Sequence, residues 1–172
     1  MPHVTANGIK IAYETYGADN APTVLMIMGL GGQLTMWSDE LVEDLIKGGY
    51  RVILFDNRDI GLSHHHSGEK SPGILRQIVL RRIGIKLKTP YALADMAHDT
   101  LGLMDALKLD QVHLVGISMG GMIGQHVASM APNRVKSLTA IMTTTGNPKL
   151  PRPSGEVMKA MVRGGPQPTE RA

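Results

Sequence analysis

The run from Leu114 to Gly121 reads as a strand that turns sharply at Ser118 and then enters a helix. Its Gly-x-Ser-x-Gly spacing places Gly116 and Gly120 two residues to either side of the serine. A side chain at either position would collide with a strained turn, and glycine removes that collision. The turn would expose the Ser118 hydroxyl above a sheet, beside the Met119 amide at a helix N-terminus. This geometry suits a nucleophile and an oxyanion donor, although an ordinary strand–helix turn can have the same spacing.

Buried strands and amphipathic helices alternate along the rest of the chain. Residues 3–15 alternate around Asn7-Gly8, which predicts an antiparallel hairpin. Further strands are predicted at 23–28, 51–55, 111–117 and 135–142, and helices at 39–48, 91–107 and 119–131. Asp95 and Asp99 fall on a polar face of the second helix. The fold class that follows is α/β, with a mostly parallel sheet, an antiparallel N-terminal hairpin and helices on both faces.

A glycine-rich loop, Met28 to Gln33, directly follows the strand at 23–28. Gly29 lets the backbone approach a ligand closely, and the Leu30 amide is positioned to be a second oxyanion donor beside that of Met119. The loop matches neither glycine-rich phosphate-binding pattern. The competing interpretation is an ordinary turn between a strand and a helix.

The strand at 51–55 ends in a polar run from Asp56 to Ser63. Asp56 or Asp59 could pair with Arg58 and fix this loop, so the three residues are interpreted as support for a pocket rim and not as catalysts. His64, His65 and His66 follow at once. Neighbouring residues do not converge on one ion without a sharp bend, so these histidines predict an exposed patch and no metal site.

The composition of the chain excludes several kinds of site. The chain has 172 residues, no cysteine and a net charge of +3, which excludes disulfides and thiolate metal sites and gives no case for nucleic-acid binding. The first residues lack the features of a signal peptide, and no apolar run approaches the length of a membrane span. These features predict a cytoplasmic protein.

Together, the three motifs resemble the amino-terminal part of the α/β-hydrolase fold. The stretches from Val24 to Trp37 and from Tyr91 to Gly121 are most similar to the esterase branch that includes aclacinomycin methylesterase. The resemblance extends from the first hairpin to about Thr145. It implies hydrolysis of a small-molecule ester through an acyl-enzyme on Ser118, with neither metal nor organic cofactor. Met28 stands where most relatives have histidine, which leaves the backbone donor at Leu30 unaffected.

The same resemblance shows what the chain lacks. In this fold the serine is followed by an acid and then by a histidine. After Ser118 the chain has no Asp, only His126, and only Glu156 and Glu170. His126 would lie roughly 12 Å along the helix from the serine, too far to take its proton. The sequence therefore looks like the front half of a longer hydrolase, with residues 1–145 as its core.

Two segments depart from the strand–helix alternation. Residues 72–90 mix basic and apolar residues, which predicts an insertion with a solvated basic face or, less favoured, a helix on a membrane surface. Residues 146–172 form a proline-rich tail, the start of a lid or cap segment, in which Ser154 would cap a short helix.

Three alternatives to the ester hydrolase stay open. The chain could be a catalytically impaired remnant that associates through an exposed sheet edge at 135–142. His64, His65, His66 or His98 could act as an improvised base. A perhydrolase or acyltransferase would use the same nucleophile with a different acceptor.

Overall fold

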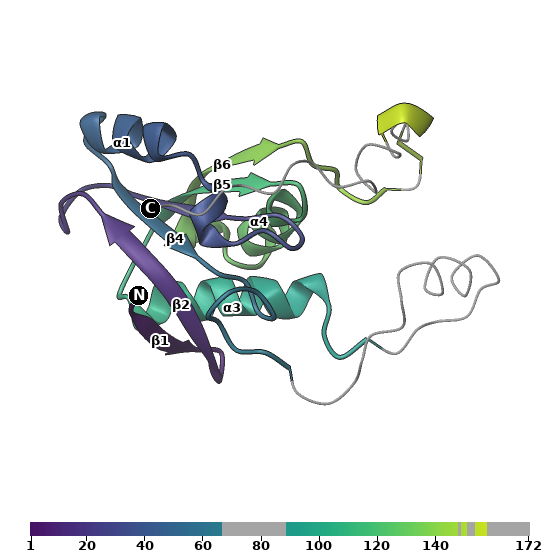
Figure 1. Ribbon diagram of the computed structural model, residues 1–172, viewed down its shortest axis with the longest axis horizontal. Helices are drawn as coiled ribbons and strands as arrows, with labels where there is room; N and C mark the ends of the chain where they lie inside the picture. The colour runs from purple at the N-terminus through teal and green to yellow at the C-terminus, as the bar shows by residue number, and fades with distance from the viewer. Residues whose placement is uncertain (67–88, 148, 151–153, 158–172) are drawn as a thin grey trace.

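A computed structural model describes residues 1–66, 89–147, 149–150 and 154–157 (Figure 1). The chain begins with the predicted hairpin, in which β1 (His3–Ala6) pairs antiparallel with β2 (Ile9–Tyr16). Its turn has positive φ at both central residues, 49° at Asn7 and 77° at Gly8. This is the turn that the Asn-Gly pair favours, because its twist matches that of the flanking strands.

Six strands form one sheet in the order β1-β2-β4-β3-β5-β6. The four parallel strands are β3 (Thr23–Ile27), β4 (Arg51–Phe55), β5 (Val112–Ile117) and β6 (Val135–Ile141), and β2 joins β4 antiparallel. The predicted mostly parallel sheet with an antiparallel hairpin is therefore confirmed.

The longer helices cover both faces of this sheet (Figure 1). On one face lie α3 (Leu93–Ala106) and α4 (Met119–Met130), and α1 (Asp39–Lys47) covers the other. Successive residues of β3 alternate between the two cores: Leu25 and Ile27 join the α3 and α4 side, while Val24 and Met26 join the α1 side. All five β3 residues are buried, because a central parallel strand packs on both of its faces. Two short 3-10 helices lie in the connections, Leu34–Met36 after β3 and Pro132–Arg134 before β6.

The parallel register brings the ends of four strands to one edge of the sheet. Ile27 pairs with Phe55 and with Gly116, and Ile117 pairs with Ile141. The segments that follow β3, β4, β5 and β6 therefore begin side by side at this edge. In the described part of the chain, β6 pairs with β5 alone and forms one outer strand of the sheet, with β1 as the other.

Several predictions fall partly or wholly outside the described residues. The basic segment at 72–90 is described only at residues 89 and 90, and most of the tail is not described. Within the tail, residues 155–157 are helical and the Ser154 hydroxyl accepts a hydrogen bond from the Val157 amide at 3.3 Å, as a cap does. The boundary between a core at 1–145 and a tail at 146–172 stays a prediction. Among the helices that the structure describes, none is both long and apolar enough to span a membrane.

Candidate active site

Ser118 occupies a strained turn between β5 and α4. Its φ is 54° and its ψ is −119°, a backbone conformation that residues with a Cβ rarely adopt. The Ser118 amide donates to the Ile141 carbonyl at 2.8 Å, which extends the ladder between β5 and β6 by one bond. The residue is partly buried, so its side chain is not sealed inside the core.

The glycines around Ser118 are required by close backbone contacts. A Cβ on Gly116 would lie 2.5 Å from the Gly120 carbonyl oxygen, and one on Gly120 would lie 2.0 Å from the Ile27 carbonyl oxygen. Both distances are shorter than any that real Cβ atoms make, and backbone cannot move aside as a flexible side chain would. The two glycines therefore allow the turn to close and α4 to pack against the end of β3.

The loop after β3 lies directly against the serine. A Cβ on Gly29 would be 3.2 Å from the Ser118 Cβ and 3.7 Å from its hydroxyl oxygen. The Gly29 carbonyl accepts a hydrogen bond from Gly32 at 3.2 Å, in a turn that passes through Gly31 with φ of 74°. The Leu30 side chain is 76% exposed and extends away from the protein.

Two backbone amides beside the serine are unpaired among the residues that the structure describes. Neither the Leu30 amide nor the Met119 amide donates a hydrogen bond to another described group. One follows Gly29 in the adjacent loop and the other is the first residue of α4. Neither amide is therefore already used by a described protein group, and their role as oxyanion donors stays a prediction.

Side chains after β4 hold this loop at two points. One carboxylate oxygen of Asp56 accepts the Leu34 amide at 2.8 Å, and the other accepts the Leu62 amide at 3.1 Å. The Asn57 side chain donates to the Met28 carbonyl at 3.0 Å. Asp56 and Asn57 are both buried. Asn57 was not among the predicted site residues, although it stands inside the polar run that indicated loop support.

The predicted pairing of Arg58 with Asp56 or Asp59 is wrong, because its partner is Asp99 in α3. Two guanidinium nitrogens of Arg58 each donate to a different Asp99 oxygen at 2.6 Å. The Asn7 side chain donates to the same carboxylate at 2.8 Å. Asp99 is 3% exposed, so its predicted place on a polar helix face is also wrong. Burial is tolerated here because three charge-assisted or amide hydrogen bonds satisfy the carboxylate.

These bonds shift the ionisation of their neighbours. The hydrogen bond to Asp99 raises the pKa of Arg58, against the opposing effect of burial. Burial and a hydrogen bond to Asp59 raise the pKa of Tyr91 to about 12. Burial alone would raise the pKa of Asp59, but hydrogen bonds from Tyr91 and the His66 amide outweigh it, so that this pKa is lowered. Arg58 also lies over the Tyr91 ring, 4.9 Å from its centroid.

No described histidine accepts a hydrogen bond from the Ser118 hydroxyl. Four are exposed at positions outside the turn: His64, His65, His66 and His98. His126 is exposed on α4, eight residues beyond the serine. In the described ranges, no group of three or more histidine, cysteine and acidic side chains could hold a metal ion.

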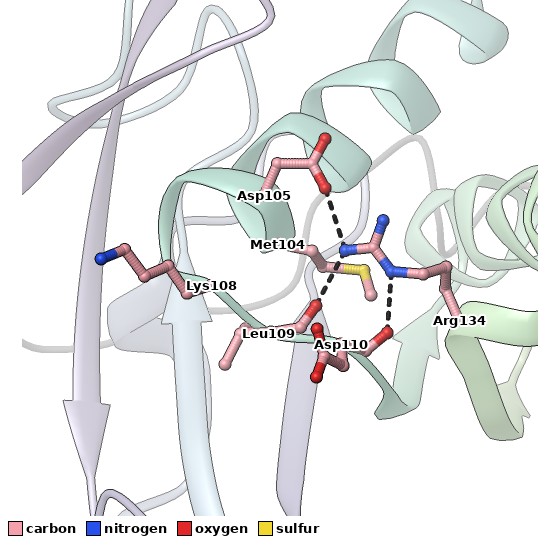
Figure 2. Close-up of a pocket in the computed structure, with 6 residues that line it drawn as sticks. All are labelled: Met104, Asp105, Lys108, Leu109, Asp110 and Arg134. Atoms are coloured by element: carbon pink, nitrogen blue, oxygen red, sulfur yellow. Dashed lines mark hydrogen bonds and ion pairs between the residues drawn. The ribbon is translucent and has the colours of Figure 1, made fainter.

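A shallow pocket lies at the other end of the parallel strands, away from Ser118. Figure 2 shows it where α3 ends and where the chain enters β5 and β6. Lys108 and Arg134 are its two cations, and Arg134 is bound by protein groups: it donates to the Asp105 carboxylate at 2.9 Å and to the Leu109 and Asp110 carbonyls at 2.8 and 2.7 Å. We therefore interpret these contacts of Arg134 as structural, because they stabilise the connection between α3 and β5.

Comparison with known proteins gives a consistent family. A family model for the alpha/beta hydrolase fold matches residues 22–168. The rhodomycin D methylesterase DauP of Streptomyces sp. strain C5 is 30% identical over 139 residues, which are 81% of this chain and 41% of that protein. This match confirms the resemblance to methylesterases that the motifs indicated.

Solved structures extend the comparison to the fold in space. A hydrolase from Pseudomonas aeruginosa superposes with a TM-score of 0.67 at 29% identity, over 83% of this chain and 46% of that one. The enol-lactonase from Burkholderia xenovorans superposes with a TM-score of 0.62 at 29% identity, over 80% of this chain and 45% of that one. The chain thus spans less than half the length of each of these three proteins.

Proposed function

Because the chain belongs to the alpha/beta hydrolase fold family, we propose that it carries the nucleophile half of a carboxylic ester hydrolase, with Ser118 as the attacking residue. The observation that supports this most directly is the positive φ of Ser118 at the strand–helix junction, with Gly29 of the neighbouring loop in contact range of its side chain. Strain of this kind is kept where surrounding structure enforces it, and such positions cluster at functional sites. The methylesterase and the enol-lactonase both act on ester-type bonds, which favours a small-molecule carboxylic ester as the substrate here.

The proposed reaction has two covalent steps. The Ser118 hydroxyl oxygen attacks the ester carbonyl carbon while its proton passes to solvent, and the resulting oxyanion accepts hydrogen bonds from the Leu30 and Met119 amides. Collapse of this intermediate breaks the bond to the alcohol oxygen, which leaves with a proton and gives an acyl-serine. Water then attacks the acyl carbon, releasing the carboxylic acid and restoring the hydroxyl. Each oxyanion donor would contribute about 3–4 kcal/mol to transition-state stabilisation.

The rate of ester hydrolysis by this chain alone should be low. A serine hydroxyl without a neighbouring base is a weak nucleophile, and loss of the base lowers turnover by several orders of magnitude in serine hydrolases. We therefore test acylation with an activated ester and do not rely on turnover of a natural one. Transfer of the acyl group to an acceptor other than water would use the same acyl-serine, and product analysis separates the two outcomes.

The test is incubation of the chain with p-nitrophenyl acetate, followed by mass spectrometry of the intact protein and its peptides. We expect one acetyl group on Ser118 and none in Ser118→Ala. Ser129→Ala is the matched control, since Ser129 is an exposed serine of α4 outside the turn. Equal labelling of the wild type and Ser118→Ala would show that Ser118 is not the nucleophile.

A further inference from the structure

The residue that bonds most closely to the serine turn lies outside every motif that the sequence offered. Thr143 stands two residues beyond the end of β6, after Met142, whose φ is 47°. Its hydroxyl donates to the Ser118 carbonyl oxygen at 2.6 Å. The side chain is partly buried against Gly121, where a Cβ would lie 2.8 Å from the Thr143 Cβ. The end of β6 is thus tied to the first peptide of α4.

The carbonyl that Thr143 holds belongs to the same peptide plane as the Met119 amide. In a trans peptide the C=O and N–H bonds point in opposite directions, so holding the carbonyl fixes the direction of the amide. The Ser118 carbonyl also accepts from the Gly121 and Met122 amides, at 3.1 and 3.4 Å, which are longer bonds in the first turn of α4. A hydroxyl bonded to the carbonyl also polarises the peptide and strengthens its N–H as a donor.

The Leu30 amide is also held through a hydrogen bond to the carbonyl of its own peptide. The Leu30 amide shares its peptide with the Gly29 carbonyl, which accepts from Gly32 at 3.2 Å. In that loop the support comes from backbone and survives most side-chain changes. On the Met119 side one of the supports is a single side-chain hydroxyl, which a substitution can remove. The two amides can therefore be perturbed separately.

We propose that Thr143 is a positioning residue that aims the Met119 amide at the oxyanion of the Ser118 ester reaction. This inference rests on the proposed function, since it assigns a role within the same site. Thr143 does not touch the substrate and acts only through the peptide between Ser118 and Met119. Its removal should slow formation of the acyl-serine and leave ester binding unchanged.

The test compares substitutions that keep or remove the hydroxyl. Thr143→Val replaces it with a methyl group of similar shape, and we expect the acylation rate at saturating p-nitrophenyl acetate to fall about tenfold, the effect of losing one hydrogen bond of about 1.4 kcal/mol. The ester concentration at half-saturation should not change. Thr143→Ser, which retains the hydroxyl, should restore the rate. Thr139→Val, the same change at an exposed threonine of β6, should have no effect.

A second pair of variants keeps the test valid where Thr143→Val disturbs the fold. Thr143→Ser and Thr143→Ala are both smaller than threonine and differ only in the hydroxyl, so the serine variant should react about tenfold faster than the alanine variant. Equal rates in hydroxyl-bearing and hydroxyl-free variants would overturn the role of Thr143 while leaving the nucleophile intact. Labelling that persists in Ser118→Ala would instead overturn the ester hydrolase proposal, and the role of Thr143 with it.

Discussion

At the scale of a single residue, the backbone of Ser118 is strained because this residue carries a Cβ. A Cβ at φ of 54° and ψ of −119° crowds the backbone, whereas glycine adopts this region freely. We therefore expect Ser118→Gly to be more stable to urea unfolding than Ser118→Ala by about 1–2 kcal/mol. Both variants lack the hydroxyl, so the comparison isolates the Cβ.

The control for this comparison is a glycine-to-alanine change without strain. Among the described residues, no atom lies within 4 Å of a Cβ built on Gly155, and the φ of this glycine is not positive. If Ser118→Gly were no more stable than Ser118→Ala, the turn would carry no strain, and the argument for a held nucleophile would lose its energetic basis.

The residues that sequence reasoning missed share a physical reason. Asp99, Asn57 and Thr143 all bond to groups far away in the chain: Asp99 meets Arg58 across 41 residues, Asn57 meets Met28 across 29, and Thr143 meets Ser118 across 25. Helical spacing placed Asp99 on a polar face because periodicity carries no information about a partner on another element. Gly116 and Gly120, by contrast, act on their own turn, and local spacing was enough to single them out.

At the scale of elements, a hydrogen bond joins the loop after β4 to the segment just before α3. Tyr91 donates this bond to the Asp59 carboxylate. Burial and the hydrogen bond to Asp59 raise the pKa of Tyr91 to about 12, from an ordinary value of 10.0. Between these pH values the unfolded chain releases the tyrosine proton and the folded chain keeps it. The stability that this bond contributes is therefore complete below pH 10 and is lost as the pH rises to about 12.

The measurement is the free energy of unfolding as a function of pH in wild type and Tyr91→Phe. We expect the wild type to lose more stability than Tyr91→Phe between pH 10 and 12, because phenylalanine has no proton to release. Asp59→Asn removes the charge that helps to raise the pKa of Tyr91, so its loss of stability should be smaller than in the wild type and should end at a lower pH. Parallel curves for wild type and Tyr91→Phe would contradict the linkage.

At the scale of the whole molecule, the alternation of strands and helices was enough to predict the layers of the fold. The alternation of β3 residues between two cores follows from its continuous apolar sequence. The sheet order could not be derived from that alternation alone, because nothing local states that β4 lies between β2 and β3. That order is what gathers the segments after β3, β4 and β5 around Ser118, so the candidate site depends on information that only the fold contains.

The outer strand of this sheet leads to the last prediction. In the described part of the chain β6 pairs only with β5, and four of its seven residues are exposed, of which Lys136 alone is charged. An edge with unpaired backbone groups and little charge recruits other strands. We expect the apparent mass in sedimentation velocity to rise with concentration, and Thr139→Lys to suppress that rise by adding a charge to the edge. Ser129→Lys adds the same charge on α4 and should leave association unchanged. Equal suppression by both variants would point to net charge, and a monomer at every concentration would exclude pairing through β6.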